Sequence, residues 1–237
     1  MVNKPEMKIP RGFNEVEHWV FDLDNTLYPP RFDLFAQIDI RMTEFIGSYL
    51  SVDEAEARRV QKEFYVEHGT TLAGLMAVHQ MKPQAFLDYV HMIDVSVVPP
   101  DPALGEAIAR LPGRKVIFTN GSVAHAENVV RRLGILDVFD GVYDIVTTGF
   151  APKPHALAFE RFLTASGIDA KRAAMFEDLP RNLEVPHILG MTTVWVRPQG
   201  NAGPERYQKL SYEGGDGEHI HHIADDLTSF LQALTRA

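Results

Sequence analysis

VFDLDNTLYPP, residues Val20 to Pro30, is an apolar run that ends in two aspartates and is closed by two prolines. Side chains two apart in a β-strand project from the same face, so Asp22 and Asp24 are expected to lie close together where a strand ends. Two carboxylates that close need a cation or a shared proton between them. Taken alone, the pair fits a solvated or turn-capping pair as well as a functional one, so its meaning depends on the rest of the chain.

The composition is that of a globular protein, with 237 residues, 45% of them hydrophobic, and a net charge of -9. A chain of this length can bury a sizeable core, as one large domain or as one domain with an insertion. Nucleic acid polymers and anionic membranes are not expected as partners, because both repel a surplus of acid. The lack of cysteine excludes disulfides, thiolate metal sites and cysteine nucleophiles.

Targeting signals are not evident. No apolar run reaches the ~18 residues that a membrane span needs, and the N-terminal stretch MVNKPEMKIPRGF lacks the apolar segment of a signal peptide. We therefore expect a cytoplasmic protein. The sequence leaves open whether it is a monomer or a homodimer.

Short apolar runs recur along the chain, and turns and helical patterns separate them. The runs are HWVFDLD (18–24), RKVIFTNGS (114–122), YDIVTTGF (143–150), AAMFEDLP (173–180) and TTVWV (192–196). Continuous apolarity suits strands that are buried on both faces of a parallel sheet. The alternation of strand and helix predicts an α/β fold with a doubly wound, mostly parallel, Rossmann-like sheet.

One interval breaks this alternation. Between Pro30 and Val116 the crossover needs only about a dozen residues, yet helical patterns fill 33–50, 53–69 and 83–94. We predict an inserted helical cap over residues 31–99, with residues 1–30 and 100–237 forming the core. The proline-rich stretches YPPRF and SVVPPDP at its ends are expected to act as hinges.

Two segments near the C-terminus lie outside the alternation of strand and helix. Residues 200–219, GNAGPERYQKLSYEGGDGEH, are predicted to be a surface loop because glycine-rich polar segments have little to bury. In EHIHHIADDL, His219 and His221 alternate onto one strand face, which suggests zinc, but no third ligand is evident. A last edge strand that runs into a helix capped near Asp225 accounts for the segment better, and the role of the His219, His221 and His222 cluster stays open.

The polar residues of the chain fall where the predicted strands end, which is where open parallel sheets bind their ligands. In chain order they are Asp22 and Asp24, then Thr119, Asn120 and Gly121, then Lys153, then Glu177 and Asp178. The acids would repel one another unless a hard divalent cation lay between them, and oxygen ligands completed by a phosphate suit Mg²⁺. Thr119, the N–H groups of the following helix start and the Lys153 ammonium would hold a dianion.

This set of motifs matches a known family. DLDNTL, a strand end with TNG, a lysine before a helix and an apolar strand that ends in Glu-Asp together resemble the four motifs of the haloacid dehalogenase (HAD) superfamily. The resemblance covers the whole chain, with the helical interval where that superfamily carries its cap. More finely, DLDNTLYP, HGTTLAGL and FEDLPRNLEVPH resemble the pyrimidine 5'-nucleotidase branch. The resemblance implies a HAD-type phosphatase.

The resemblance also implies roles. Asp22 would attack phosphorus and form an aspartyl-phosphate, and Asp24 would act first as acid and then as base. Mg²⁺ would be held by the Asp22 carboxylate, the Asp24 main-chain carbonyl and Asp178, with Glu177 more remote or ligating through water. Thr119 and Lys153 would bind the phosphoryl oxygens.

Three positions carry further expectations. Asn120 and Gly121 are predicted to bind substrate beside Thr119. Many relatives carry a second acid four places after the residue equivalent to Asp178, whereas this chain has Asn182. The support of Lys153 is therefore an open question.

Within the cap, HGTT (68–71) interrupts two helical patterns. We predict that Thr70 and Thr71 contact the substrate. The alternative is an ordinary helix connection that contains a glycine.

The leading hypothesis is a Mg²⁺-dependent phosphomonoesterase that acts on a small phosphorylated metabolite, with the pyrimidine nucleotides UMP and CMP first among the candidates. Near alternatives are a sugar-phosphate or phosphoglycolate phosphatase, or a phosphomutase that returns the phosphoryl group to a sugar. Dehalogenation is disfavoured, because that chemistry uses no Mg²⁺ and needs no acid at Asp24. A hypothesis from another class is a non-catalytic phosphate-binding protein.

Overall fold

The computed structural model describes residues 12–199 and 205–235 of the chain. The start of the N-terminal stretch that bears on targeting, residues 1–11, and residues 200–204 of the predicted surface loop lie outside the described residues. Within the described ranges, each helix is too short or too polar to cross a membrane.

The described strands form one parallel sheet in the order β3-β2-β1-β4-β5-β6. They are β1 (His18–Phe21), β2 (Arg114–Phe118), β3 (Gly141–Tyr143), β4 (Ala173–Glu177), β5 (Thr192–Val196) and β6 (His222–Ala224). The chain moves outward from β1 to one edge and then from β4 to the other edge. The predicted doubly wound α/β fold is confirmed, and the strand order switches between β1 and β4, at the centre of the sheet.

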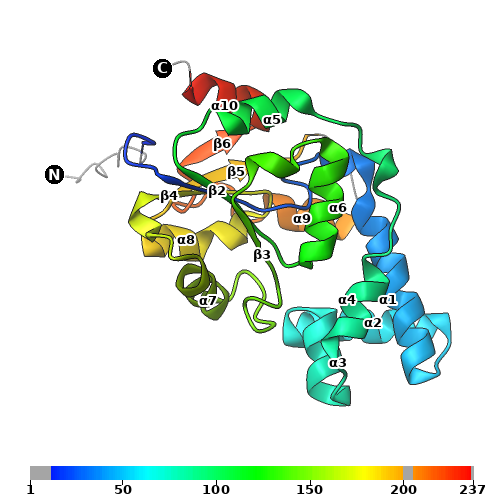
Figure 1. Ribbon diagram of the computed structural model, residues 1–237. Helices are drawn as coiled ribbons and strands as arrows, with labels where there is room; N and C mark the ends of the chain where they lie inside the picture. The colour runs from blue at the N-terminus through cyan, green and yellow to red at the C-terminus, as the bar shows by residue number, and fades with distance from the viewer. Residues whose placement is uncertain (1–11, 200–204, 236–237) are drawn as a thin grey trace.

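The strands are apolar throughout because both of their faces are covered. Trp19 and Phe21 belong to one hydrophobic cluster, and Val20 between them belongs to the other. One face packs against α5 (Pro102–Ala109), α6 (Val123–Leu133) and α10 (Leu227–Leu234), and the other against α7 (Ala156–Ser166) and α8 (Glu184–Leu189). Figure 1 shows the sheet between these two groups of helices.

The third strand is much shorter than predicted. β3 ends at Tyr143, and the prediction of a strand over 143–150 is wrong beyond that residue. The cause is Asp144, whose carboxylate accepts from the N–H and the hydroxyl of Thr147, both at 2.9 Å, and so turns the chain. In the loop that follows β3, Ile145 and Phe150 pack against the helices of the cap.

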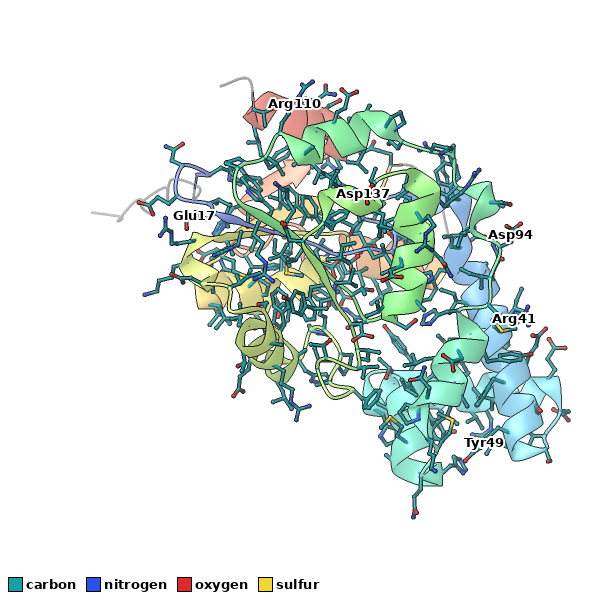
Figure 2. All side chains as sticks on the ribbon, viewed as in Figure 1. Glu17, Arg41, Tyr49, Asp94, Arg110 and Asp137 are labelled. Atoms are coloured by element: carbon teal, nitrogen blue, oxygen red, sulfur yellow. The ribbon has the colours of Figure 1, made fainter. Side chains whose placement is uncertain are left out.

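Four helices lie together beside the sheet rather than on it (Figure 1). They are α1 (Leu34–Leu50), α2 (Glu54–His68), α3 (Thr71–His79) and α4 (Pro83–Val90). They pack around a hydrophobic cluster of their own, to which Ile46, Phe64 and Phe86 contribute. In Figure 2, Arg41 and Tyr49 mark α1 on the side of this bundle away from the sheet. This separate core supports the proposed division into a cap, residues 31–99, and a core.

The segment before β6 contains a helix that the sequence did not predict. Residues 205–212 form α9 (Glu205–Tyr212), so the prediction of a surface loop is wrong for this part. α10 is capped by Asp226, one residue later than expected, while Asp225 pairs with Arg197 at 2.7 Å.

One histidine of this region, His221, has structural partners. Thr193 N–H donates to His221 Nδ1 at 3.1 Å, and His221 Nε2 lies 3.1 Å from His187 Nδ1. Because Nδ1 accepts, the ring hydrogen sits on Nε2 and faces His187. His221 therefore ties β5 to α8, which accounts for one member of the cluster without a metal.

Candidate active site

Adjacent strands end at the same level and bring the predicted polar residues to one rim of the sheet. β1 lies between β2 and β4, with Phe21 level with Ile117 on one side and with Phe176 on the other. The residues that follow at this rim include Asp22, Thr119, Glu177 and Asp178. The rim lies where the strand order switches, which is the position at which open parallel sheets bind ligands.

Lys153 joins this rim from the loop before α7, and its ammonium lies between two acids. Nζ is 2.6 Å from Asp22 Oδ1 and 3.3 Å from Glu177 Oε1, and it donates to the Phe118 carbonyl at 2.9 Å. Only 4% of Lys153 is exposed. A buried charge is tolerated when it is paired and its hydrogens have acceptors, and these three oxygens meet that condition.

Asn120 fastens the main chain of Lys153. Its side-chain oxygen accepts from the Lys153 N–H at 2.8 Å, and its amide nitrogen donates to the Lys153 carbonyl at 3.2 Å. These two hydrogen bonds tie the end of β2 to the loop before α7. The structure therefore gives Asn120 a positioning contact, and its predicted contact with substrate stays a prediction.

Asn182 supports the same ion pair from the other side. Its Nδ2 donates to Glu177 Oε1, the oxygen that faces Lys153. Asn182 is buried, and an uncharged donor here favours the ionised form of Glu177. A second acid could not do this without adding negative charge. The open question about Lys153 thus has a structural answer, since Asn182 acts on it through Glu177.

Burial and the charges of neighbouring groups shift the pKa values of the acids at the rim. Burial and the charge of Glu177 raise the pKa of Asp22 to about 7, against the opposing effect of Lys153. Burial would also raise the pKa of Glu177, but the charge of Lys153 and the hydrogen bonds to Glu177 lower it. Burial lowers the pKa of Lys153, and the two carboxylates more than reverse this. The single positive charge of Lys153 therefore offsets the negative charge of Glu177, and no second positive charge offsets that of Asp22 among these groups.

Asp178 is the third acid of the rim, and a tyrosine of α9 holds it. Burial and the charges of Glu177 and Asp22 raise the pKa of Asp178 well above its usual range. Tyr207 donates its hydroxyl proton to Asp178 Oδ2 at 2.7 Å. The unpredicted helix thus reaches directly into the site.

Asp22, Glu177 and Asp178 form a group suited to a hard divalent cation. Each offers a carboxylate oxygen, and these oxygens lie within 4.8 Å of one another. Burial, followed by the charges of neighbouring acids, raises the pKa values of Asp22 and Asp178, and a bound cation would oppose both effects. A set of oxygen ligands is what Mg²⁺ prefers. The residues present therefore fit Mg²⁺.

Asp24, two residues after Asp22, has different partners. His125 Nε2 lies 2.7 Å from Asp24 Oδ1, and Tyr28 donates its hydroxyl proton to the same oxygen at 2.6 Å. Burial raises the pKa of Asp24, but the charge and hydrogen bond of His125, together with Tyr28, outweigh burial and bring the pKa to about 2. In this arrangement Asp24 is ionised, whereas Asp22 titrates near neutral pH.

The start of α6 offers fewer N–H groups to an anion than the sequence predicts. Thr119 Oγ1 accepts from the Gly121 N–H at 2.9 Å, and the Val123 N–H donates to Asp144 Oδ2 at 3.1 Å. These two amides already have partners. The Thr119 oxygen accepts, so its own proton is the group left to donate, and anion binding by this hydroxyl and by Lys153 stays a prediction.

The cap threonines use their hydroxyl groups within the cap. Thr70 Oγ1 accepts from the Ala73 N–H at 3.0 Å as the N-cap of α3, and Thr71 Oγ1 donates to the Gln61 carbonyl at 3.2 Å. The loop nevertheless faces the core, because a Cβ atom placed on Gly69 would lie 3.1 Å from His155 Nε2. Substrate contact by the two hydroxyls stays a prediction.

Tyr28, His125 and Tyr207 are site residues that the sequence did not reveal. Tyr28 had a signal, because it lies four residues after Asp24, as Thr26 does after Asp22, and both hydroxyls donate back to those aspartates. His125 lies on the buried face of a helix, where a histidine is usually part of the core. Tyr207 had no signal, because it lies in a polar, glycine-rich segment.

Comparisons with known proteins agree with this geometry. The profile of a hydrolase family, described as haloacid dehalogenase-like hydrolase, matches residues 16–185. Phosphate metabolism protein 8 of Saccharomyces cerevisiae is 30% identical over 194 residues, which are 75% of this chain and 59% of that protein. The chain thus spans about three fifths of the length of this curated relative.

Solved structures share the fold. A HAD phosphatase from Thermococcus onnurineus matches with a TM-score of 0.61 and 20% identity, over 92% of this chain and 98% of that one. L-2-haloacid dehalogenase from Xanthobacter autotrophicus matches with a TM-score of 0.60 and 16% identity, over the same shares of the two chains. At such identities the likeness shows the fold and no more.

The surplus of acid at the rim predicts that Asp22→Asn stabilises the metal-free protein at high pH. A folded-state pKa of about 7, above the usual 3.8, means that the stability Asp22 provides is fully present below pH 3.8 and is lost as the pH rises through 7. Asparagine does not ionise, so at pH 8 the variant should be more stable by about 1–4 kcal/mol, since one pKa unit is worth ~1.4 kcal/mol.

Urea unfolding in EDTA at pH 5 and pH 8 measures this difference, which should shrink at pH 5. Lys153→Met is the opposing control and should destabilise the protein at pH 8, because it leaves two buried acids without their cation. An Asp22→Asn variant that is less stable than the wild type at pH 8 would contradict the assignment of surplus charge.

Proposed function

The chain belongs to the haloacid dehalogenase-like hydrolases, and from this premise we propose that it is a Mg²⁺-dependent phosphomonoesterase that forms an aspartyl-phosphate on Asp22. The observation that carries the proposal is the pairing of Asp22 with the Lys153 ammonium, 2.6 Å away, beside two further acids at the switch point of the sheet. This arrangement offers a nucleophile, a cation for the phosphoryl group and a set of metal ligands in one place.

In the first step a carboxylate oxygen of Asp22 attacks phosphorus, and the bond between phosphorus and the leaving oxygen breaks. Lys153 and the Thr119 hydroxyl bind the phosphoryl oxygens, and Thr26 orients Asp22 by donating to its Oδ2 at 3.0 Å. Asn120 holds the main chain of Lys153, and the Phe118 carbonyl and Glu177 hold its ammonium, which therefore does not need to be ordered during the reaction.

Asp24 moves the protons. It donates a proton to the leaving oxygen in the first step, and in the second step it takes a proton from the water that attacks phosphorus, which releases phosphate and restores Asp22. The ionised Asp24 seen here suits the second step. For the first step Asp24 must be protonated, and the approach of a phosphoryl dianion favours that form, because like charges raise the pKa of a carboxyl group.

The residues that would hold Mg²⁺ are the carboxylates of Asp22 and Asp178 and the main-chain carbonyl of Asp24, with Glu177 bound to Lys153 nearby. When bound, the cation supplies charge neutralisation and orientation of the phosphoryl group. Tyr207 keeps Asp178 in place by donating its hydroxyl proton to Oδ2.

A phosphate ester is favoured over a haloacid as the substrate by this chain's own residues. Two donors fix one oxygen of Asp24, so that its other oxygen can transfer a proton. The acids around Asp22 suit a cation. The likeness to dehalogenase structures concerns the fold. The yeast relative is named for phosphate metabolism, which supports the same choice.

For the substrate we propose a pyrimidine nucleoside 5'-monophosphate, on the strength of the motifs DLDNTLYP, HGTTLAGL and FEDLPRNLEVPH. The cap loop at Gly69 lies beside His155, two residues after Lys153, so a group attached to the phosphate would meet the cap there. Sugar phosphates and phosphoglycolate are the near alternatives. In each case the proposed partner is a small phosphorylated metabolite.

Phosphate release from a panel of monophosphates with Mg²⁺ tests the function. Wild-type protein should hydrolyse UMP and CMP with higher kcat/KM than AMP, GMP, sugar phosphates or phosphoglycolate. Asp22→Asn should lower kcat by at least ~10³-fold, because it removes the nucleophile, and EDTA should act similarly. Asp137→Asn, an exposed change outside the cap (Figure 2), is the matched control.

Two outcomes of this panel count against the proposal. Equal phosphate release by the wild type, Asp22→Asn and the EDTA sample would favour a non-catalytic phosphate-binding protein. A preference for sugar phosphates would contradict the proposed pyrimidine nucleotide substrate but not the proposed hydrolysis of a phosphomonoester.

Tyr207→Phe is predicted to weaken Mg²⁺ binding by about 10-fold, because partners that orient a metal ligand are worth 10-fold or more in affinity. Titration calorimetry and the Mg²⁺-dependent rise in melting temperature both measure this. Tyr212→Phe is the control, since that hydroxyl lies on the same helix but donates to the Pro198 carbonyl. Equal or tighter Mg²⁺ binding by Tyr207→Phe would show that the tyrosine does not support the site.

A further inference from the structure

The partners of Asp24 come from two places in the chain and act on one oxygen. Tyr28 follows in the same turn, and His125 lies in α6, and both bond Asp24 Oδ1, at 2.6 Å and 2.7 Å. Oδ1 is therefore anchored twice, and Oδ2 is the oxygen left to face a substrate. An acid or base must hold its reacting oxygen within hydrogen-bond reach of the proton that moves, so the anchor determines whether Asp24 can act.

The ring of His125 is fixed in the orientation that this bond requires. His125 is 1% exposed, and within the described residues its Nδ1 has no hydrogen-bond partner. An ionised carboxylate can only accept, so Nε2 carries a hydrogen and His125 donates it to Asp24 Oδ1.

A histidine from the cap holds this ring. His91, the residue that ends α4, stacks on His125 with ring centroids 4.6 Å apart and planes 13° apart. Its Nδ1 is 3.0 Å from the hydroxyl oxygen of Ser122, the N-cap of α6. The cap thus contacts both the N-cap residue of the helix that carries His125 and the face of the His125 ring.

We propose that His125 is the positioning residue for Asp24, and that His91 of the cap holds His125 in place, so that docking of the cap on α6 sets the orientation of the acid and base. The inference rests on the proposed function. It adds to that function a physical path from the cap to the proton-transfer group: His91 contacts His125, and His125 contacts Asp24.

The leaving group of the substrate provides the test. p-Nitrophenolate departs without a proton, whereas the alkoxide of a nucleoside or sugar phosphate needs one from Asp24. The ratio kcat/KM reports only the steps through formation of the aspartyl-phosphate, so the second step does not enter. A residue that positions Asp24 should therefore matter for alkyl phosphates and not for p-nitrophenyl phosphate.

His125→Leu is expected to lower kcat/KM for the best alkyl phosphate of the panel by about 10–100-fold, part of the 10²–10⁴ that proton transfer contributes, and that for p-nitrophenyl phosphate by less than ~3-fold. His125→Gln, whose amide reaches the position of Nε2, should recover most of the lost rate. His125→Asn is too short to reach Asp24 and should not. The Gln and Asn pair decides the matter if His125→Leu does not fold.

His91→Leu should reproduce the same selective loss more weakly, at about 3–10-fold, and should add little when His125 is already leucine, because coupled residues are not additive. His79→Leu, an exposed change elsewhere in the cap, is the matched control and should leave both rates unchanged.

Four results separate the possible failures. Equal losses on both substrate classes, or no difference between His125→Gln and His125→Asn, would overturn the positioning role. Additive effects of His91→Leu and His125→Leu would overturn the link to the cap. Wild-type protein without activity on either substrate class would overturn the proposed function itself, and this inference with it.

Discussion

The ammonium of Lys153, buried between Asp22 and Glu177, is the interaction on which the rest of this site depends. A charge in such a position is stable only when every neighbour is placed to satisfy it. That requirement explains the Phe118 carbonyl on Nζ, the Asn120 clamp on the Lys153 main chain and the Asn182 amide on Glu177. The parallel strands supply the geometry, because β2, β1 and β4 end level with one another. One ion pair therefore unites four segments that are far apart in the sequence.

The two aspartates of the first strand end differ because their partners differ. Asp22 shares one ammonium with Glu177 and has a raised pKa, whereas Asp24 receives two hydrogen bonds on one oxygen and has a lowered pKa. A site can give two nearby acids separate tasks through environments that shift their pKa values in opposite directions. Asp22 is placed where a metal and a phosphoryl group would offset its charge. Asp24 is placed next to the cap, through His125 and His91, where the leaving group would lie.

The sequence predicted the doubly wound parallel sheet, because that fold class follows from local pattern. Continuous apolar strands and the position of acids at strand ends depend on short-range periodicity, as Val20 to Asp24 shows. The errors arise where a side chain acts across the fold. Asp144 turns the chain and shortens β3, and Tyr207 reaches Asp178 from a segment whose composition indicates a loop. His125 was missed because a histidine on a buried helix face has the same pattern whether it supports the core or an active-site acid.

Mass spectrometry of acid-quenched protein, taken shortly after mixing with a phosphomonoester and Mg²⁺, is the sharpest test of covalent catalysis by Asp22. We expect one phosphoryl group on the peptide that contains Asp22, its removal by hydroxylamine as for an acyl phosphate, and none on Asp22→Asn. A phosphoryl group on another residue, or phosphate release by Asp22→Asn at the wild-type rate, would contradict it.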